Sequence, residues 1–78
     1  MMKVLYFAHL KEIMNINEEQ ISLNEAYSVL KFKQYLIEKH PELKDETFQI
    51  AVNEEFVQDT NVVSDQDVVA LIPPVSGG

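Results

Sequence analysis

The stretch Val68-Val69-Ala70-Leu71-Ile72, which runs directly into Pro73-Pro74, decides the fold of this 78-residue chain. Every position from Val68 to Ile72 is apolar, which is typical of a strand that is buried on both faces, central in its sheet and often parallel to a neighbour. Pro73 and Pro74 lack backbone donors and hold φ near about −65°, so sheet pairing ends there. We therefore expect a central last strand, followed by a semi-rigid extended segment.

The beginning of the chain predicts two further strands. Lys3 to Ala8 carries apolar side chains in both alternation phases, which predicts a first strand covered on both faces. His9 to Met14 indicates a short helical turn, and Asn15 to Glu19 a polar loop. A short second strand is expected at Gln20 to Leu23.

One helix is predicted in the middle of the chain. Ser28 is a suitable N-cap, and Val29, Phe32 and Leu36 follow at the i, i+3 and i+7 spacing of one buried stripe. Pro41 prevents the helix from continuing beyond the residue before it. This amphipathic helix can cover only one face of a sheet.

The region after the helix predicts a hairpin. Phe48 to Asn53 has the alternation of a strand, Asn53 to Glu55 supplies a turn, and Phe56-Val57 forms a short return strand. The turn lacks the strong Asn-Gly signal. Val62-Val63 is a further apolar pair before the last strand.

This order of elements indicates an α+β domain in which one main helix covers one face of a mixed sheet. A right-handed crossover between parallel strands places the helix there. The arrangement is the β-grasp (ubiquitin-like) fold. We expect residues 1–72 to form the β-grasp domain and residues 73–78 to form an extended C-terminal tail.

Composition narrows the class of protein. The chain is 46% apolar and has no cysteine, so one small core must form without disulfides or zinc-thiolate clusters. No apolar run approaches the roughly 20 residues of a membrane span, and none resembles a signal peptide. We expect a cytoplasmic protein without membrane contacts. The formal charge of −7 repels phosphate backbones, so we expect no nucleic acid and favour partners with basic surfaces.

Catalytic and metal motifs are missing from the sequence. His9 and His40 are the only imidazoles and have no ligand pattern around them, so we assign no metal. A calcium loop starting at Asp59 fails because Val63 and Ser64 occupy its fifth and sixth positions. There is no Ser/His/Asp motif, glycine-rich phosphate loop or cysteine nucleophile. We expect the chain alone to bind no cofactor.

The one chemical group with an unusual presentation is the carboxylate at the end of the tail. Gly77 and Gly78 have no Cβ, so a terminal carboxylate on Gly78 could enter a slot too narrow for other residues. Adenylation by ATP would turn this poor electrophile into a mixed anhydride, which a sulfur nucleophile could open to a thiocarboxylate or thioester. A frayed end is the ordinary alternative, but such ends tend to be charged, whereas Pro73 to Ser76 carries no charge.

The chain resembles the small, sulfur-carrying subunits of molybdopterin synthase nearly from end to end. The resemblance rests on four segments: Val4-Leu5-Tyr6-Phe7-Ala8 with Leu10-Lys11-Glu12, Ser28-Val29 with Phe32 and Leu36, Ala51-Val52-Asn53, and Asp67 to Gly78. The ending Pro-Pro-Val-Ser-Gly-Gly is its most specific part. Two positions where the family usually has glycine are Asn15 and Gln66 here. Asn tolerates the left-handed conformation. Gln66 leaves the geometry of the turn before the last strand undetermined.

This resemblance implies a sulfurtransferase subunit that acts as sulfur donor. An adenylating enzyme would activate Gly78 with ATP, and a sulfur donor would convert it to a thiocarboxylate. The tail would then enter a basic pocket of the large subunit, which binds the cyclic pyranopterin precursor and receives the sulfur. The family assembly is a heterotetramer with two copies of each subunit.

The resemblance also implies a docking surface. The first and last strands are apolar in both phases and one helix covers one face, so the other face needs a partner. The implied contacts are Phe7, Phe56 and Ile72, around the root of the tail. The tail contacts are the four residues before the glycines, Pro73, Pro74, Val75 and Ser76. Because the strand phase is not fixed by sequence, Phe7, Phe56 and Ile72 could each equally be core residues.

Three other functions remain open at this point. A thiamine-pathway sulfur carrier would share the fold and terminal chemistry, although the Tyr-Phe-Ala start and Pro-Pro-Val-Ser ending argue against it. A ubiquitin-like modifier would be joined through Gly78 to lysines of target proteins. A non-catalytic interaction domain would not need Gly77 and Gly78 at all.

Overall fold

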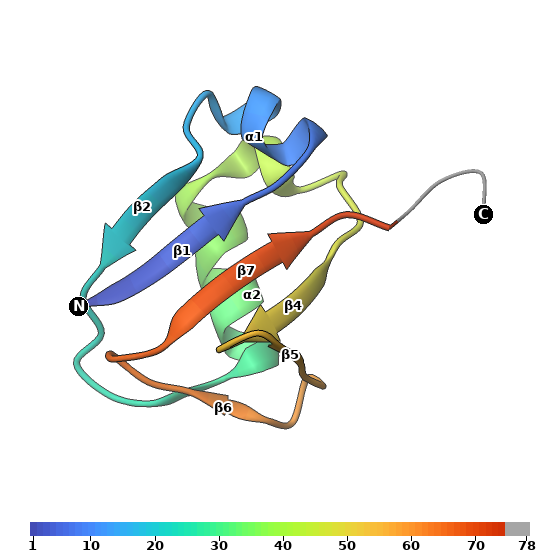
Figure 1. Ribbon diagram of the computed structural model, residues 1–78. Helices are drawn as coiled ribbons and strands as arrows, with labels where there is room; N and C mark the ends of the chain where they lie inside the picture. Colours follow the sequence, from blue (N-terminus) through green and yellow to red (C-terminus); the bar gives the residue numbers. More distant parts are fainter. Residues whose placement is uncertain (75–78) are drawn as a thin grey trace.

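The fold is seen in a computed structural model that describes residues 1–74 (Figure 1). The elements in chain order are β1 (Met2–Tyr6), α1 (His9–Met14), β2 (Glu18–Ile21), β3 (Tyr27–Ser28), α2 (Val29–Lys39), the 3-10 helix η1 (Pro41–Leu43), β4 (Gln49–Val52), β5 (Glu55–Phe56), β6 (Val62–Val63) and β7 (Val68–Ile72).

The main sheet has five strands in the order β2-β1-β7-β4-β5. The last strand, β7, lies in its centre, with β1 parallel on one side and β4 antiparallel on the other. In the register, Tyr6 and Ile50 both lie opposite Leu71. The predicted central last strand in a mixed sheet is therefore confirmed.

Helix α2 crosses one face of this sheet (Figure 1). The Ser28 hydroxyl accepts a hydrogen bond from the Lys31 N–H at 3.1 Å and so caps the first turn, as predicted. The helix presents the buried stripe Val29, Phe32 and Leu36. The sheet residues that join this stripe in the core are Met2, Val4, Tyr6, Ile21, Ile50, Val69 and Leu71.

A second, two-stranded sheet was not predicted. β3 pairs antiparallel with β6, with Tyr27 opposite Val63 and Ser28 opposite Val62. Each strand has only two residues, which is too short for an alternation signal. The pair holds the start of α2 in place, because the Val29 N–H also donates to the Asn61 carbonyl at 2.8 Å.

The second strand of the main sheet begins earlier than the predicted Gln20 to Leu23. β2 lies at Glu18–Ile21 because its pairing with β1 places Glu18 opposite Leu5 and Ile21 opposite Met2. Leu23 has already left the sheet, and its N–H donates to the Asp65 carboxylate at 2.8 Å. The partner strand, rather than the local apolar pattern, fixes these bounds.

A polar cluster closes the core at the C-terminal end of α2. The Tyr6 hydroxyl donates to the Glu19 carboxylate, which also contacts His40 Nε2 at 2.7 Å and Lys39 Nζ at 3.4 Å. Burial and the bond to Glu19 raise the pKa of the Tyr6 hydroxyl. Burial also acts to raise the pKa of Glu19, but the bonds to Tyr6 and His40 and the Lys39 charge outweigh it and lower that pKa. An ionised Glu19 therefore ties β1, β2 and α2 together.

Candidate partner-docking site

The sheet face away from α2 is the candidate site, and we call it the outer face. Figure 1 looks onto this face, with α2 behind the sheet and no helix or strand of residues 1–74 in front of it. The register places Leu5, Ala70, Ala51 and Phe56 side by side across β1, β7, β4 and β5. The apolar residues in this alternation phase are Leu5, Phe7, Ala51, Phe56, Val68, Ala70 and Ile72.

Much of the outer face is open to solvent. Phe56 is 65% exposed, Phe7 46% and Val68 38%, while Leu5 and Ala70 are half-buried. The prediction that the first and last strands are covered on both faces is therefore wrong for the described chain. Their second apolar phase faces outward because α2, the one long helix, lies on the opposite side.

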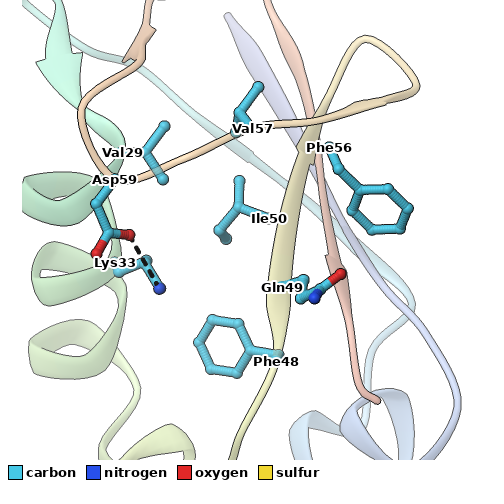
Figure 2. Close-up of a pocket in the computed structure, with 8 residues that line it drawn as sticks. All are labelled: Val29, Lys33, Phe48, Gln49, Ile50, Phe56, Val57 and Asp59. Atoms are coloured by element: carbon cyan, nitrogen blue, oxygen red, sulfur yellow. Dashed lines mark hydrogen bonds and ion pairs between the residues drawn. The ribbon is translucent and has the colours of Figure 1, made fainter. Parts of the chain in front are cut away.

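The two predicted phenylalanine contacts both lie on this face. Figure 2 shows Phe56 and Gln49 on the opposite side of β4 from Phe48 and Ile50, which point toward α2. Phe7 follows Leu5 in the same alternation phase, one residue beyond the end of β1. Leu5, Phe7 and Lys11 help to line a shallow hollow of about 280 Å³ at this end of the face.

The root of the tail begins at Ile72, the last residue of β7, which has the outer-face phase. Ile72 lies opposite Gln49 at the end of β7 and is half-buried. Pro73 is buried and Pro74 is exposed, so the exit begins as a packed segment and ends in solvent. The predicted contacts Val75 and Ser76 and the predicted reactive residues Gly77 and Gly78 lie outside the described residues.

Acidic side chains border the outer face. Glu18 lies opposite Leu5 on β2 and forms an exposed ion pair with Lys3 at 3.9 Å. Glu54 is exposed in the turn before Phe56 at the other edge, whereas Glu55 pairs with Val52 in the inner phase of the sheet. An apolar centre between acidic edges fits a partner with an apolar patch and basic surroundings.

A second hollow lies on the inner side of the sheet, between α2 and the β4–β5 edge (Figure 2). Its apolar floor includes Val29, Ile50 and Val57, and Lys33 Nζ meets the Asp59 carboxylate at 3.3 Å at its rim. Its volume of about 170 Å³ is below the roughly 300 Å³ of small-molecule sites. It is a gap at the edge of the core rather than a substrate pocket.

Neither a metal cluster nor a membrane-spanning helix is found among residues 1–74. Among residues 1–74, no group of three or more His, Asp or Glu side chains could hold a metal ion. Within that range there is also no helix with the length and hydropathy needed to cross a membrane.

Sequence reasoning named Phe7, Phe56 and Ile72 but missed the middle of the face. Leu5 and Ala70 connect the two phenylalanines across the sheet, and Val68 extends the face to its far end. Their signal was present in the sequence, because they share an alternation phase with the named residues. The register shows which residues share a face, and only the packing of α2 against the other phase shows which face points outward.

The chain is similar in sequence and in structure to known proteins. Residues 4–78 match the ThiS family. The chain is 39% identical to the molybdopterin synthase sulfur carrier subunit of Chlamydomonas reinhardtii, over 97% of this chain and 96% of that protein. A Pyrococcus furiosus structure, described as subunit 1 of a molybdopterin converting factor, matches with a TM-score of 0.85 and 31% identity, covering 95% of this chain and 97% of that one.

A solved complex contains a further similar chain. It is the complex of subunits 1 and 2 of the molybdopterin-converting factor from Helicobacter pylori 26695. The match has a TM-score of 0.70 and 29% identity, and it covers 99% of this chain and 97% of that one. The family match from residue 4 to residue 78, together with the full-length relatives, shows that this chain belongs to the ThiS family.

Proposed function

We propose that this chain is the sulfur carrier subunit of a molybdopterin synthase and that its outer face docks on a larger partner subunit. The observation that carries the proposal is the open apolar outer face, which extends to Ile72, directly before Pro73-Pro74. The chain is also similar over 97% of its length to a molybdopterin synthase sulfur carrier subunit. An exposed apolar face of this kind is typical of a protein–protein interface. The solved complex of two converting-factor subunits supports a partner of this type.

The proposed chemistry uses the chain as a carrier. A carboxylate oxygen of Gly78 attacks the α-phosphorus of ATP in an adenylating enzyme, which releases pyrophosphate and leaves an acyl-adenylate. A sulfur donor then displaces AMP, and Gly78 becomes a thiocarboxylate. In the larger subunit the sulfur passes to a cyclic pyranopterin precursor, and two carriers supply the two sulfurs of one dithiolene. We infer a heterotetramer with two copies of each subunit.

The two subunits are expected to have separate roles in the sulfur transfer. The larger subunit is expected to bind the pterin and to supply acid and base groups, because the outer face offers apolar side chains, acidic edges and a tail exit. This chain is expected to supply the docking area and the terminal sulfur. Its formal charge of −7 suits a partner whose tail pocket is basic.

Intact mass spectrometry of the protein isolated from its own cells tests the carrier chemistry. We expect a fraction whose mass reflects one oxygen-to-sulfur exchange, located to the C-terminal peptide by fragmentation. Isopeptide conjugates without any thiocarboxylate would instead identify a ubiquitin-like modifier. Recovery of a bound larger subunit, and sulfur transfer to a pterin rather than to a thiazole precursor, distinguishes the molybdopterin pathway from the thiamine pathway.

Deletion of Gly77 and Gly78 tests the role of the tail. We expect the shortened chain to fold and to retain binding to the larger subunit, because the core and outer face lie within residues 1–74. We expect it to lose sulfur transfer completely. Unchanged transfer by the shortened chain would reject the carrier function and favour a plain interaction domain.

A further inference from the structure

Two strained backbone turns lie directly beside the two exposed phenylalanines of the outer face. Among residues 1–74, the non-glycine residues with positive φ are Ala8, Asn15, Asn53 and Glu54. Ala8 follows Phe7, and the Asn53-Glu54 pair precedes Glu55-Phe56. Positive φ is uncommon for residues other than glycine, and such strain concentrates at functional sites.

The first turn connects β1 to α1. Ala8 has φ 53° and ψ −134°, and the Leu10 N–H donates to the Phe7 carbonyl at 3.1 Å. This is the geometry of a type II′ turn with Ala8 at the position that strongly prefers glycine. The turn begins at Phe7 itself, so its backbone fixes the direction in which the Phe7 side chain leaves the sheet.

The second turn connects β4 to β5. Asn53 and Glu54 have φ of 51° and 72°, and Val52 lies opposite Glu55 across the turn. Positive φ at both central residues is typical of a type I′ hairpin turn, which favours glycine at the second of them. Asn53 is fixed by β7, because its side chain accepts from the Val68 N–H at 3.0 Å and its N–H donates to the Val68 carbonyl at 2.8 Å.

Packing in the core does not explain why Ala8 and Glu54, rather than glycine, occupy these positions with positive φ. Both side chains are exposed, so neither contributes to the core. Glycine would relieve the strain at either position without loss of buried area. Glycine would also let the chain swing about the turn, and the residue held by each turn is a phenylalanine that is 46% or 65% exposed.

We propose that Ala8 and Glu54 are positioning residues that hold Phe7 and Phe56 in the orientation required for docking. The inference rests on the proposed function, in which these phenylalanines contact the larger subunit. A side chain that is already fixed loses less conformational entropy on binding, so a rigid turn strengthens the complex. The backbone strain lowers the stability of the free chain, and the preorganised phenylalanines raise its affinity for the larger subunit.

Glycine substitution separates the positioning role from a role in folding. If the residues are positioning residues, glycine should raise the stability of the free chain but lower its affinity for the larger subunit. Ala8→Gly and Glu54→Gly should each raise the thermal midpoint of the free chain by about 4 °C, since the strain is relieved. Each should weaken binding to the larger subunit about threefold to tenfold at high salt, where loss of the Glu54 charge contributes little. Asn15→Gly is the matched control, because Asn15 has φ 60° at the end of α1 and adjoins neither phenylalanine. It should leave the affinity unchanged.

Chemical synthesis of the full chain with D-alanine in place of Ala8 gives a second, sharper comparison. The observed φ and ψ mirror the extended region that L-residues prefer, so D-alanine adopts them without strain and without the freedom of glycine. This chain should be stabilised like Ala8→Gly but should bind like the unmodified protein. Equal loss of affinity with D-alanine and with glycine would overturn the proposal.

Backbone order parameters of the free chain provide a readout that needs no partner. The Phe7 amide should become more mobile in Ala8→Gly, the Phe56 amide in Glu54→Gly, and neither in Asn15→Gly. Unchanged order at both phenylalanines would reject the positioning role even if the proposed function is correct. Failure of the unmodified chain to bind the larger subunit would reject the proposed function, while the order parameters would still decide the role of the turns.

Discussion

Leu71 and Ile72 are neighbours in β7, yet Leu71 is fully buried under α2 and Ile72 lies half-buried on the outer face. The same contrast separates buried Tyr6 from exposed Phe7, and buried Ile50 from exposed Phe56. β7 is apolar on both faces, so hydrophobicity does not distinguish its buried residues from its outer ones. The difference shows that an apolar strand residue need not be buried by the folded chain itself.

The largest expected effect compares the two faces within β7. Leu71→Ala should lower the free energy of unfolding by about 2–5 kcal/mol, because it opens a cavity in the core. Ile72→Ala should cost about 1 kcal/mol or less, since its side chain is already partly hydrated. Urea unfolding of both variants measures the difference. Equal losses would show that the outer face contributes to folding as much as the inner face does.

The next effect concerns recognition. Phe56→Ala should weaken binding to the larger subunit by about 2 kcal/mol, roughly thirtyfold, as expected for an aromatic anchor at an interface. Its unfolding free energy should change by less than about 0.5 kcal/mol. Val62→Ala is the matched control, because Val62 is 61% exposed on the separate two-stranded sheet. Isothermal titration calorimetry would contradict the prediction if both variants bound equally well.

A smaller effect is the pH dependence of the inner polar cluster. The pKa of Glu19 is lowered in the folded chain, so its contribution to stability is present above the unfolded pKa and is lost as the pH falls through the folded pKa. Stability should therefore decline from about pH 5 downward, and Glu19→Gln should flatten this slope. Urea midpoints measured across that range provide the test. An identical slope in the variant would assign acid sensitivity to other carboxylates.

The smallest effect is expected at the acidic edge of the outer face. Glu18→Gln removes the exposed pair with Lys3 and should change stability by less than about 0.5 kcal/mol. It should slow association with a basic partner about twofold at low salt, and the difference should disappear at high salt. Stopped-flow association rates at two salt concentrations measure it. A salt-independent difference would mean that Glu18 makes a direct contact.

Much of the fold was predictable from local patterns. The apolar run of β7, the Ser28 cap and the stripe from Val29 to Leu36 each act within a single element, so the sequence displays them directly. Asn15 also behaves as expected, because it ends α1 in the left-handed conformation. Gln66 does not have positive φ, so the turn from Ser64 to Asp67 needs no glycine there.

The remainder depends on contacts between elements. The bounds of β2 follow from its pairing with β1, and the β3–β6 pair joins residues far apart in the chain. An uncovered face was expected, but its residues could not be assigned, because alternation gives two phases without saying which one α2 covers. The positive φ of Ala8 and Glu54 was hidden for a related reason. Neither residue type signals such a turn, and the fold imposes it.

The position of β7 also affects how the chain is made. The strand that completes the sheet is encoded last, and β1 and β4 touch it rather than each other. The β1–β2 and β4–β5 pairs can form before β7 is made, but only β7 joins them, and its parallel pairing with β1 closes nearly the whole chain into one loop. A chain that stops before Val68 lacks the central strand of its sheet, so the sheet is complete only when the segment that leads to Pro73 is present.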